Sequence, residues 1–270
     1  MKELASSKIG CIGTGNMGGA IISGISEFFS PTNVFIYDKD ESKARHISSL
    51  YRTSRAETIE DIAKICDIVI VAVKPSVVPD VLREIKPYCE NKTIVSIAAG
   101  VAIHKLENIL GSSQKIIRVM PNTPSLVREG MSVLAANKAT DDKTLEHVKE
   151  IFSKIGTAIV MSEEYMDAVT GVSGSGPAYV FTFIQAMADG AVKMGIPRKE
   201  ALILAAQTVL GAAKMVLHED INPIELRDGV ASPGGTTIEA VHILEDRGFA
   251  GAVMSAIEAA VKKSRNMGNE

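Results

Sequence analysis

The chain has 270 residues, of which 46% are hydrophobic and 23% are charged, an ordinary balance for one large globular domain or two smaller ones. The formal net charge of −3 provides no basic surface for nucleic acid, so we expect no nucleic-acid partner. Three scattered cysteines and five histidines without ligand-like spacing argue against a disulfide framework and against a bound metal.

Short apolar runs alternate with helical patterns over the first part of the chain. The runs that predict strands are KIGCIG (8–13), NVFIYD (33–38), DIVIVAV (67–73), KTIVSIA (92–98) and KIIRVM (115–120), with MSVLAA (131–136) and TAIVMS (157–162) as further edge strands. Helical patterns follow the first two runs at Asn16–Phe29 and near 41–50. This alternation predicts an α/β fold, with a doubly wound, mostly parallel sheet covered by helices on both faces.

The pattern changes near residue 162. From Glu163 onward no segment predicts a strand, so we expect an α/β domain over 1–162 and an all-α domain over 163–270. Helical patterns cover Tyr179–Met194 and Glu200–Leu217. No proline- or glycine-rich linker separates the two regions, which predicts closely coupled domains.

The second of these helices is unusually apolar. In ALILAAQTVLGAAKMVL (201–217) the polar residues are Gln207, Thr208 and Lys214. A helix that is apolar on nearly all faces must be buried. Either a partner chain covers it or the first domain does.

Neither of the two long uncharged segments predicts export or a membrane span. Ile9–Ser26 is interrupted by several glycines and by Asn16, whereas a signal peptide needs a continuous apolar core. Ala168–Ala188 is broken by SGSGP (173–177). We therefore expect a cytoplasmic protein without a membrane partner.

A glycine-rich turn connects the first predicted strand to the first predicted helix. GTGNMG (13–18) has the spacing G-x-G-x-x-G, in which Gly13 permits a tight turn, Gly15 admits a pyrophosphate and Gly18 lets helix and strand pack. The helix N-terminus then offers N–H groups to the phosphates. The alternative is a turn that serves packing alone. The candidate cofactor contacts here are Ile12, Gly13, Thr14, Gly15, Asn16 and Met17.

Asp38 follows the second strand, twenty residues after Gly18. A carboxylate at this place bonds the ribose hydroxyls of NAD and repels a 2′-phosphate. The neighbouring Lys39, Lys43 and Arg45 would instead attract that phosphate, so NADPH and NADH both remain candidates. Alternatively, Asp38 caps the helix that begins near Glu41.

The chain resembles the pyrroline-5-carboxylate reductase family over essentially its whole length. The motifs that carry the resemblance are IGTGNMG (12–18), AVKP (72–75), SIAAGV (96–101), MPNTP (120–124), GVSGSGPAY (171–179) and SPGGTTIEAVHILE (232–245). The last two are highly specific together. Asp38 departs from the Ser, Thr or Asn often found in members that prefer NADPH.

The resemblance implies a Rossmann NAD(P)-binding domain followed by a helical domain that interleaves with a second subunit. It implies reduction of the cyclic imine pyrroline-5-carboxylate to proline with NADPH or NADH, in a dimer or a larger ring of dimers. The residues expected to line the nicotinamide half of the cofactor are Ala72, Val73, Lys74, Pro75, Ala98 and Ala99.

The loop ASPGGTT (231–237) contains no titratable group. A basic imine can arrive protonated, so the site must mainly hold a carboxylate and orient the ring. Backbone N–H groups before a helix form an anion-binding concavity, and Thr237 adds a hydroxyl for the imine nitrogen or for a proton relay. The expected substrate contacts are Ser232, Gly235, Thr236 and Thr237. The alternative is a plain helix entry capped by Ser232 or Thr236.

Four further residues have both a functional and a structural interpretation. Lys214 is an acid–base group if the chain is a β-hydroxyacid dehydrogenase, and otherwise reaches the surface or an ion pair. Lys74 and Asn122 either contact the cofactor or shape a strand end and a turn. Ser175 is expected to cap a new helix after SGSGP, with Pro177 in its first turn, and is also a candidate substrate contact.

Two functions therefore compete with imine reduction. A β-hydroxyacid dehydrogenase-like oxidoreductase would use Lys214. A non-catalytic cofactor-sensing protein would need no substrate loop, and SPGGTT argues against it.

Overall fold

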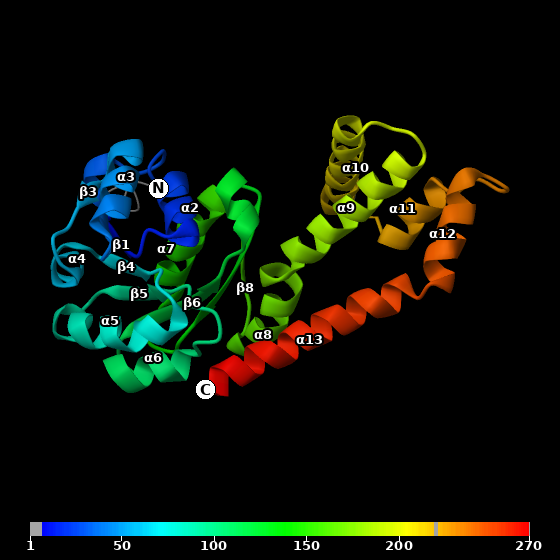
Figure 1. Cartoon of the computed structure of the whole chain (residues 1–270). Helices are drawn as coiled ribbons and strands as arrows, with labels where there is room; N and C mark the ends of the chain where they lie inside the picture. Colours follow the sequence, from blue (N-terminus) through cyan, green and yellow to red (C-terminus); the bar gives the residue numbers. More distant parts are fainter. Residues whose placement is uncertain (1–6, 219–220, 270) are drawn as a thin grey trace. The chain divides into compact units, whose positions relative to one another are not determined.

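The structure is a computed structural model that describes residues 7–218 and 221–269 (Figure 1). Its internal contacts divide the chain into two compact units. The sheet unit comprises the chain up to Ser175 together with the residues from Ala260 onward, and the helical unit comprises Gly176–Ala259. The boundary predicted at residue 162 lies just after the last strand, which ends at Val160. The contacts divide the chain into units further along, after Ser175.

The sheet unit contains one eight-stranded sheet with the order β3-β2-β1-β4-β5-β6-β7-β8. Its strands are β1 (Ile9–Ile12), β2 (Val34–Tyr37), β3 (Ser54–Arg55), β4 (Ile68–Val71), β5 (Thr93–Ser96), β6 (Lys115–Met120), β7 (Gly130–Ala136) and β8 (Gly156–Val160). Among the described strands, β6 and β7 pair antiparallel and the other neighbours pair parallel. The predicted, mostly parallel α/β sheet is confirmed, and β3 is the strand that the sequence patterns missed.

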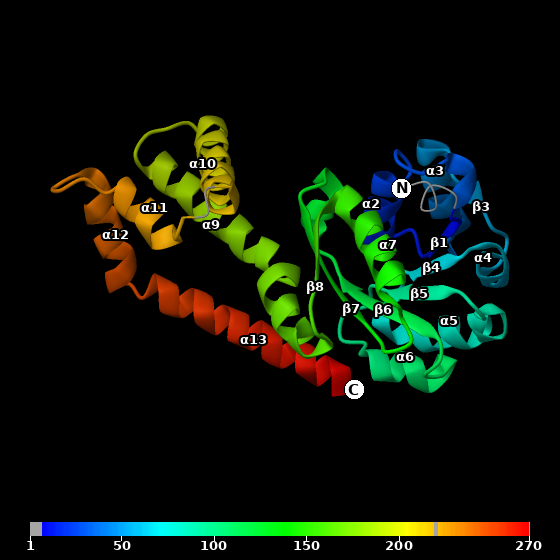
Figure 2. The ribbon, with the colours of Figure 1, turned by 180° about the vertical axis from the view of Figure 1, so that it is seen from behind.

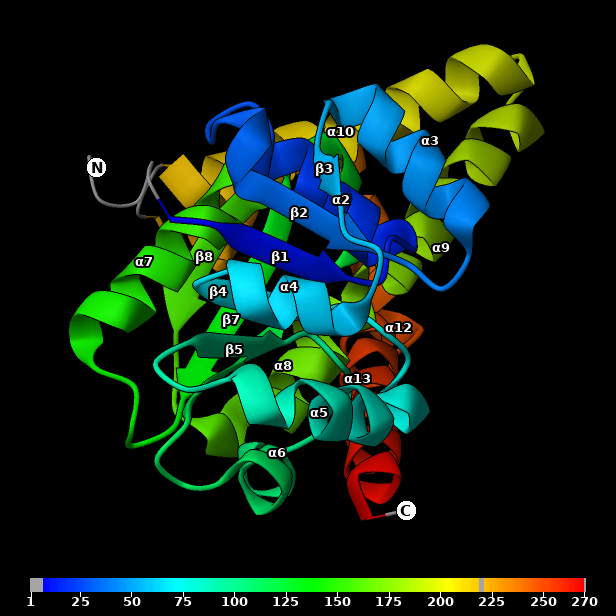
Figure 3. The ribbon, with the colours of Figure 1, turned by 90° about the vertical axis from the view of Figure 1, so that its left-hand side faces the viewer.

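Helices cover both faces of this sheet, as Figure 3 shows from the side. One face packs against α2 (Asn16–Ile25), α3 (Glu41–Tyr51) and α7 (Asp142–Phe152), and the other against α4 (Ile59–Ile65), α5 (Val78–Ile85), α6 (Ile103–Leu110) and α8 (Met166–Val169). In β4 the side chains alternate, with Ile70 in one core cluster and Val71 in the other. Because both faces are covered, the strand is apolar throughout.

The segment SGSGP separates two helices, as predicted, and Pro177 lies in the first turn of the second, but the residues before that helix form a π turn that the sequence did not predict. Residues Thr170–Gly174 form a π-helical turn between α8 and α9 (Gly176–Lys193), in which Ser175 N donates to Thr170 O at 2.8 Å. A Cβ on Gly174 would lie 2.5 Å from Met120 Cε. The glycine therefore lets the turn lie against the end of β6. Single π turns inside helices occur frequently at functional sites.

The helical unit contains α9, α10 (Arg198–His218), α11 (Pro223–Gly229), α12 (Thr236–Asp246) and the first half of α13 (Phe249–Asn269). The helices α9 and α10 lie side by side in both Figures 1 and 2, and the two predicted helices are confirmed. Their contact centres on three buried alanines, Ala188, Ala201 and Ala205. Among the described residues, α10 is the one helix long and apolar enough to cross a membrane by length and composition.

Candidate nucleotide and substrate site

The glycine turn between β1 and α2 contains three glycines with different steric requirements. A Cβ on Gly13, which has a φ of +100°, would lie 2.5 Å from Ala72 O, and one on Gly18 would lie 2.1 Å from Gly13 O. A Cβ on Gly15 would meet nothing within 4 Å. Packing alone therefore explains Gly13 and Gly18 but leaves Gly15 unexplained. The open space above Gly15 is what the approach of a pyrophosphate requires.

The N-terminus of α2 is free to bind an anion. Gly15 is its N-cap residue and provides no side-chain cap, and the first turn carries no acidic residue. The first N–H groups of a helix have no partner within the helix, and the helix dipole favours negative charge there. Gly13 N donates to Tyr37 O at 2.8 Å, which fixes the turn against the end of β2.

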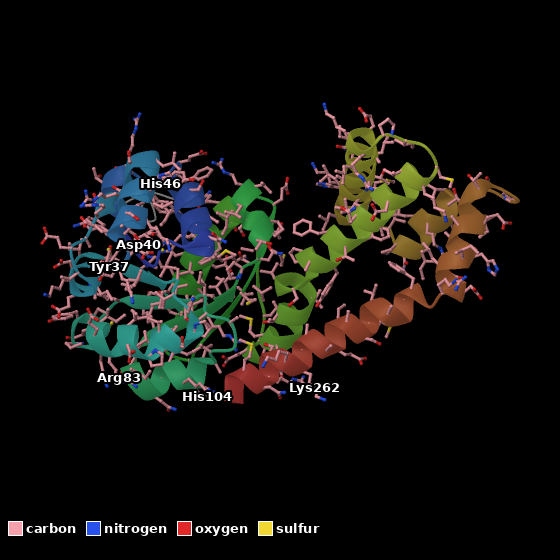
Figure 4. The ribbon with its side chains drawn as sticks, in the orientation of Figure 1. Tyr37, Asp40, His46, Arg83, His104 and Lys262 are labelled. Atoms are coloured by element: carbon pink, nitrogen blue, oxygen red, sulfur yellow. The ribbon has the colours of Figure 1, made fainter. Side chains whose placement is uncertain are left out.

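A cavity of about 690 Å³ opens at the carboxyl ends of β1, β2 and β4. It is where an open α/β sheet binds its ligand, because the strand order reverses between β1 and β4. The predicted cofactor residues that line it are Ile12, Gly13, Gly15, Asp38, Lys39, Ala72, Val73 and Lys74. Lys43, predicted to attract a 2′-phosphate, also lines it. The lining residues that sequence reasoning missed are Tyr37, Asp40, Ile59, Val77 and Val81, of which Tyr37 and Asp40 are labelled in Figure 4.

Asp38 is held by the glycine turn. Its Oδ2 accepts hydrogen bonds from Thr14 N at 2.7 Å and from Thr14 Oγ1 at 2.9 Å, and its Oδ1 accepts one from Asp40 N at 2.9 Å. The alternative role as the cap of the helix near Glu41 is wrong. Asp40 caps α3, since its side chain accepts from Ser42 N and Lys43 N. The carboxylate of Asp38 is thus fixed at the end of β2.

The other predicted cofactor residues lie outside this cavity. Thr14 holds Asp38, Asn16 is the exposed first residue of α2, and Met17 packs against the core. Pro75 and Ala99 line a neighbouring cavity of about 440 Å³, and Ala98 is buried beside it. The two cavities together follow the carboxyl ends of β1, β4 and β5.

Asn122 has a structural role that its sequence context did not reveal. Its Nδ2 donates to Ser173 O at 3.0 Å and its Oδ1 accepts from Met131 N at 2.8 Å. The residue thereby joins the loop after β6 to the π turn and to β7. This geometry favours the interpretation as a turn residue over a direct contact with nicotinamide.

Arg118 and Glu163 form a second fixed point that the motifs did not indicate. Glu163 Oε1 accepts from Ile103 N at 2.6 Å and from Arg118 Nη1 at 3.3 Å, and Arg118 is buried. Ile103 begins α6, directly after the loop that contains Ala98 and Ala99. The ion pair therefore anchors the end of that loop to β6.

Cys11 lies beneath the glycine turn and donates from its Sγ to Gly13 O at 3.4 Å. Burial, with a smaller effect of the nearby Asp38 charge, raises the pKa of this thiol to about 12. The thiol is therefore neutral at neutral pH and is no nucleophile. Among residues 7–218 and 221–269, no group of three or more His, Cys, Asp or Glu side chains could hold a metal ion.

The loop SPGGTT lies in the helical unit, where Gly235 is the N-cap residue of α12. Gly234 has a φ of +67°, and a Cβ on Gly235 would lie 2.2 Å from Ser232 Oγ. Among the residues that the structure describes, no side chain caps α12, so the predicted alternative of a cap from Ser232 or Thr236 is wrong. Gly235 N donates to Ser232 O at 3.0 Å, which leaves the N–H groups of the first helical turn as the free donors.

The hydroxyl of Thr237 is available for a ligand. Within the part of the chain that the structure describes, it has no hydrogen-bond partner, whereas the hydroxyls of Thr182 and Thr208 bond to carbonyls of their own helices. Thr237 itself is half-buried. Ser175, the other candidate substrate contact, is also half-buried and lies at the end of the π turn.

Lys214 lies on the surface of α10. In the described ranges it makes no hydrogen bond and no ion pair. The prediction that its amine reaches the surface is confirmed, and the geometry provides no partner that would make it an acid–base group.

The glycine turn, the cavity at the strand ends and the fixed carboxylate together define a dinucleotide-binding protein of the Rossmann class. The family described as NADP oxidoreductase, coenzyme F420-dependent, matches residues 8–100, and the one described as pyrroline-5-carboxylate reductase dimerisation matches residues 163–267. The chain is 44% identical to the pyrroline-5-carboxylate reductase of Escherichia coli (strain K12), over 96% of this chain and 98% of that protein.

Solved structures give the same result. A pyrroline carboxylate reductase of Plasmodium falciparum with NADP bound is 38% identical, with a TM-score of 0.87 and coverage of 98% of this chain and 99% of that one. A pyrroline-5-carboxylate reductase of Coxiella burnetii is 32% identical, with a TM-score of 0.93 and coverage of 97% and 98%. The chain belongs to the pyrroline-5-carboxylate reductase family.

Proposed function

We propose that this chain reduces 1-pyrroline-5-carboxylate to L-proline by hydride transfer from NAD(P)H, the last step of proline biosynthesis. The observation that carries the proposal is the combination of an unobstructed Gly15 at the glycine turn with an intact, uncapped SPGGTT loop at α12. A cofactor sensor would need the first feature alone. Residues 1–162 would bind the nucleotide, and residues 163–270 would bind the substrate and a second subunit.

The residues present fit NAD(P)H. The nicotinamide, when bound, supplies the hydride. The N–H groups at the start of α2 would hold the pyrophosphate over Gly15, where no protein atom lies in the way. Residues 72–75 and Ala98–Ala99 would surround the nicotinamide half, since they follow β4 and β5 at the same edge of the sheet.

Substrate binding is assigned to the start of α12. The N–H groups of Thr236, Thr237 and Ile238 would hold the substrate carboxylate, because Gly235 N is already used in the turn. The unpartnered Thr237 hydroxyl would bond the imine nitrogen or relay a proton. Ser232 shapes the turn by accepting from Gly235 N, and Ser175 is a further candidate contact. A basic imine that arrives protonated needs no strong acid from the protein.

We propose that the helical unit assembles with a second copy of the chain, as a dimer or a ring of dimers, in the cytoplasm. Large apolar side chains of α10 are exposed in the single chain, among them Ile203 at 60% and Leu217 at 79%. A matched family that is described by dimerisation supports a protein partner over a membrane for this surface. Nucleic acid is not expected.

A direct assay tests the proposed activity. The purified protein is mixed with pyrroline-5-carboxylate and either NADPH or NADH, and both the loss of reduced nucleotide and the formation of proline are measured. We expect both to proceed together, and no turnover with a β-hydroxy acid and the oxidised nucleotide. Turnover of the hydroxy acid alone would assign the chain to the dehydrogenases, and nucleotide binding without any turnover would indicate a sensor.

A further inference from the structure

The adenosine end of the nucleotide site contains an unneutralised carboxylate. Asp38 accepts three hydrogen bonds, from Thr14 N, Thr14 Oγ1 and Asp40 N, and all three donors are uncharged. Among the described residues, no cation forms an ion pair with it. The network fixes the carboxylate at the end of β2 but leaves its negative charge uncompensated.

Two of the three cations that would attract a 2′-phosphate, Lys43 and Arg45, are already paired, whereas Lys39 forms no ion pair among the described residues. Lys43 Nζ lies 3.6 Å from Asp40 Oδ2. Glu41 Oε1 lies 2.5 Å from Arg45 Nη2 and 3.8 Å from Arg55 Nη1. These pairs are exposed and individually weak, but each one lowers the positive potential available to a phosphate. In the sequence, Asp38 favours NADH and its basic neighbours favour NADPH. In the structure, these ion pairs weaken the attraction of the basic residues for a 2′-phosphate.

A further cavity, of about 650 Å³, adjoins the end of β2, and its lining contains more carboxylates than cations. The carboxylates in its lining are Asp38, Glu41 and Glu57, and the cations are Lys39 and Arg55. In a dinucleotide-binding unit, the residue at the end of the second strand distinguishes a ribose hydroxyl from a 2′-phosphate. Ribose hydroxyls donate to a carboxylate, whereas a phosphate only accepts and carries the same charge sign.

We propose that this chain binds NADH in preference to NADPH, that Asp38 determines the preference, and that Thr14 positions Asp38 for this role. The proposal rests on the proposed function, since it concerns the hydride donor of that reaction. Thr14 is a positioning residue, because it is buried, with 5% of its surface exposed, and its hydroxyl donates to Asp38.

Calorimetric titrations with NADH and with NADPH test this directly, without turnover. We expect the wild-type chain to bind NADH at least about tenfold more tightly, since like charges brought together are strongly unfavourable. In Asp38→Asn and Asp38→Ser, the dissociation constant of NADPH divided by that of NADH should fall to about one or below. Two substitutions are used because the NH2 group of an Asn side chain would face Asp40 N, which is itself a donor. The Ser variant avoids this conflict. The control Asp80→Asn removes an equal charge from α5 and should leave the ratio unchanged.

Thr14→Val separates positioning from a general structural effect. It keeps the backbone bond to Asp38 but removes the Oγ1 donor, so the ratio should fall by a few fold, on the order of one lost hydrogen bond. A merely structural defect would weaken both nucleotides equally and leave the ratio unchanged. Added salt should lower this ratio for the wild-type chain, because salt screens the repulsion between the Asp38 carboxylate and the 2′-phosphate. It should not change the ratio for Asp38→Asn.

Four outcomes would contradict the inference. NADPH binding as tightly as NADH to the wild-type chain would overturn it, as would an unchanged ratio in both Asp38 variants. An unchanged ratio in Thr14→Val would overturn the positioning role. Binding of neither nucleotide would contradict the proposed function itself and this inference with it, whereas equal binding of both would leave the proposed function intact.

Discussion

The two units of the chain bury their hydrophobic residues to very different extents. In the sheet unit, residues such as Ile21, Ile70 and Leu82 are fully buried in two clusters that lie on opposite faces of the sheet. In the helical unit, the buried hydrophobic cluster consists of three alanines. The sheet unit thus has a buried core on each face of its sheet and a formed cavity, while the helical unit presents apolar surface that a single chain does not cover.

This difference has an energetic consequence. Burying a side chain the size of isoleucine or leucine contributes about 1.5–3 kcal/mol. Leaving Ile203 and Leu217 exposed forgoes most of that contribution, and an exposed apolar surface of this kind marks an interaction site. Nucleotide binding should therefore depend on the sheet unit alone, and substrate reduction on assembly as well.

The largest expected effect is on assembly. Ile203→Asp places a charge on the exposed apolar surface of α10, and burying an unpaired charge costs several kcal/mol. We expect the variant to become monomeric at micromolar concentration by light scattering and to lose nearly all imine reduction. Its affinity for the nucleotide should remain within about twofold of wild type, since the sheet unit forms its own cavity.

Ile203→Leu is the matched control for this change. It preserves the apolar character at the same position, so the oligomer and the activity should both persist. A fully active monomer of the Ile203→Asp variant would show that the helical unit functions without a partner. The conclusion that substrate reduction depends on assembly would then be wrong.

The next largest effect separates two glycines of the same turn. Gly15→Val should fold normally, because its Cβ meets nothing within 4 Å, but should weaken nucleotide binding by about a hundredfold by filling the space for the pyrophosphate. Gly18→Val should instead destabilise the sheet unit, since a Cβ there lies 2.1 Å from Gly13 O. Thermal unfolding and nucleotide titration measure the two effects. Normal nucleotide affinity in Gly15→Val would refute the assignment of the turn.

Much of the sheet unit was predictable because its strands are apolar on both faces. Buried strands such as β4 appear in the sequence as continuous apolar runs, and the glycine spacing specified the turn after β1. The strand β3 was missed since Ser54–Arg55 is only two residues long and carries no periodic pattern. Such a strand is defined by its pairing with β2, which local sequence does not encode.

The candidate site was predicted less completely, because its contacts join distant segments. Nothing near Asp38 indicates that Thr14, 24 residues earlier, would hold its carboxylate. The glycines and proline of SGSGP predicted the break between two helices, but not the π turn that forms there and contacts Asn122 and Met120. Tertiary contacts of this kind override local propensity.

A smaller effect is expected for the substrate loop of the helical unit. Thr237→Ala removes the unpartnered hydroxyl and should lower kcat/KM by about ten- to a hundredfold, as for a hydrogen bond whose loss leaves a polar group unpaired. Thr237→Ser retains the hydroxyl and should keep most of the activity. Nucleotide affinity, measured separately, should not change in either variant. Equal loss of activity in both variants would mean that the methyl group, and thus the shape of the loop, matters more than the hydroxyl.

The smallest effect is expected at Lys214, where it decides between two enzyme classes. Lys214 is exposed on α10, and the described residues include no ion-pair partner for its amine. If the chain reduces an imine with a proton from the substrate or from Thr237, Lys214→Ala should change kcat/KM by less than about twofold, as is usual for an exposed surface residue. Lys214→Met, which keeps the aliphatic stem, controls for packing of the side chain against a second copy. If both variants lost activity by a thousandfold while remaining assembled, Lys214 would be an acid–base group, and the assignment of the proton to the substrate or Thr237 would be wrong.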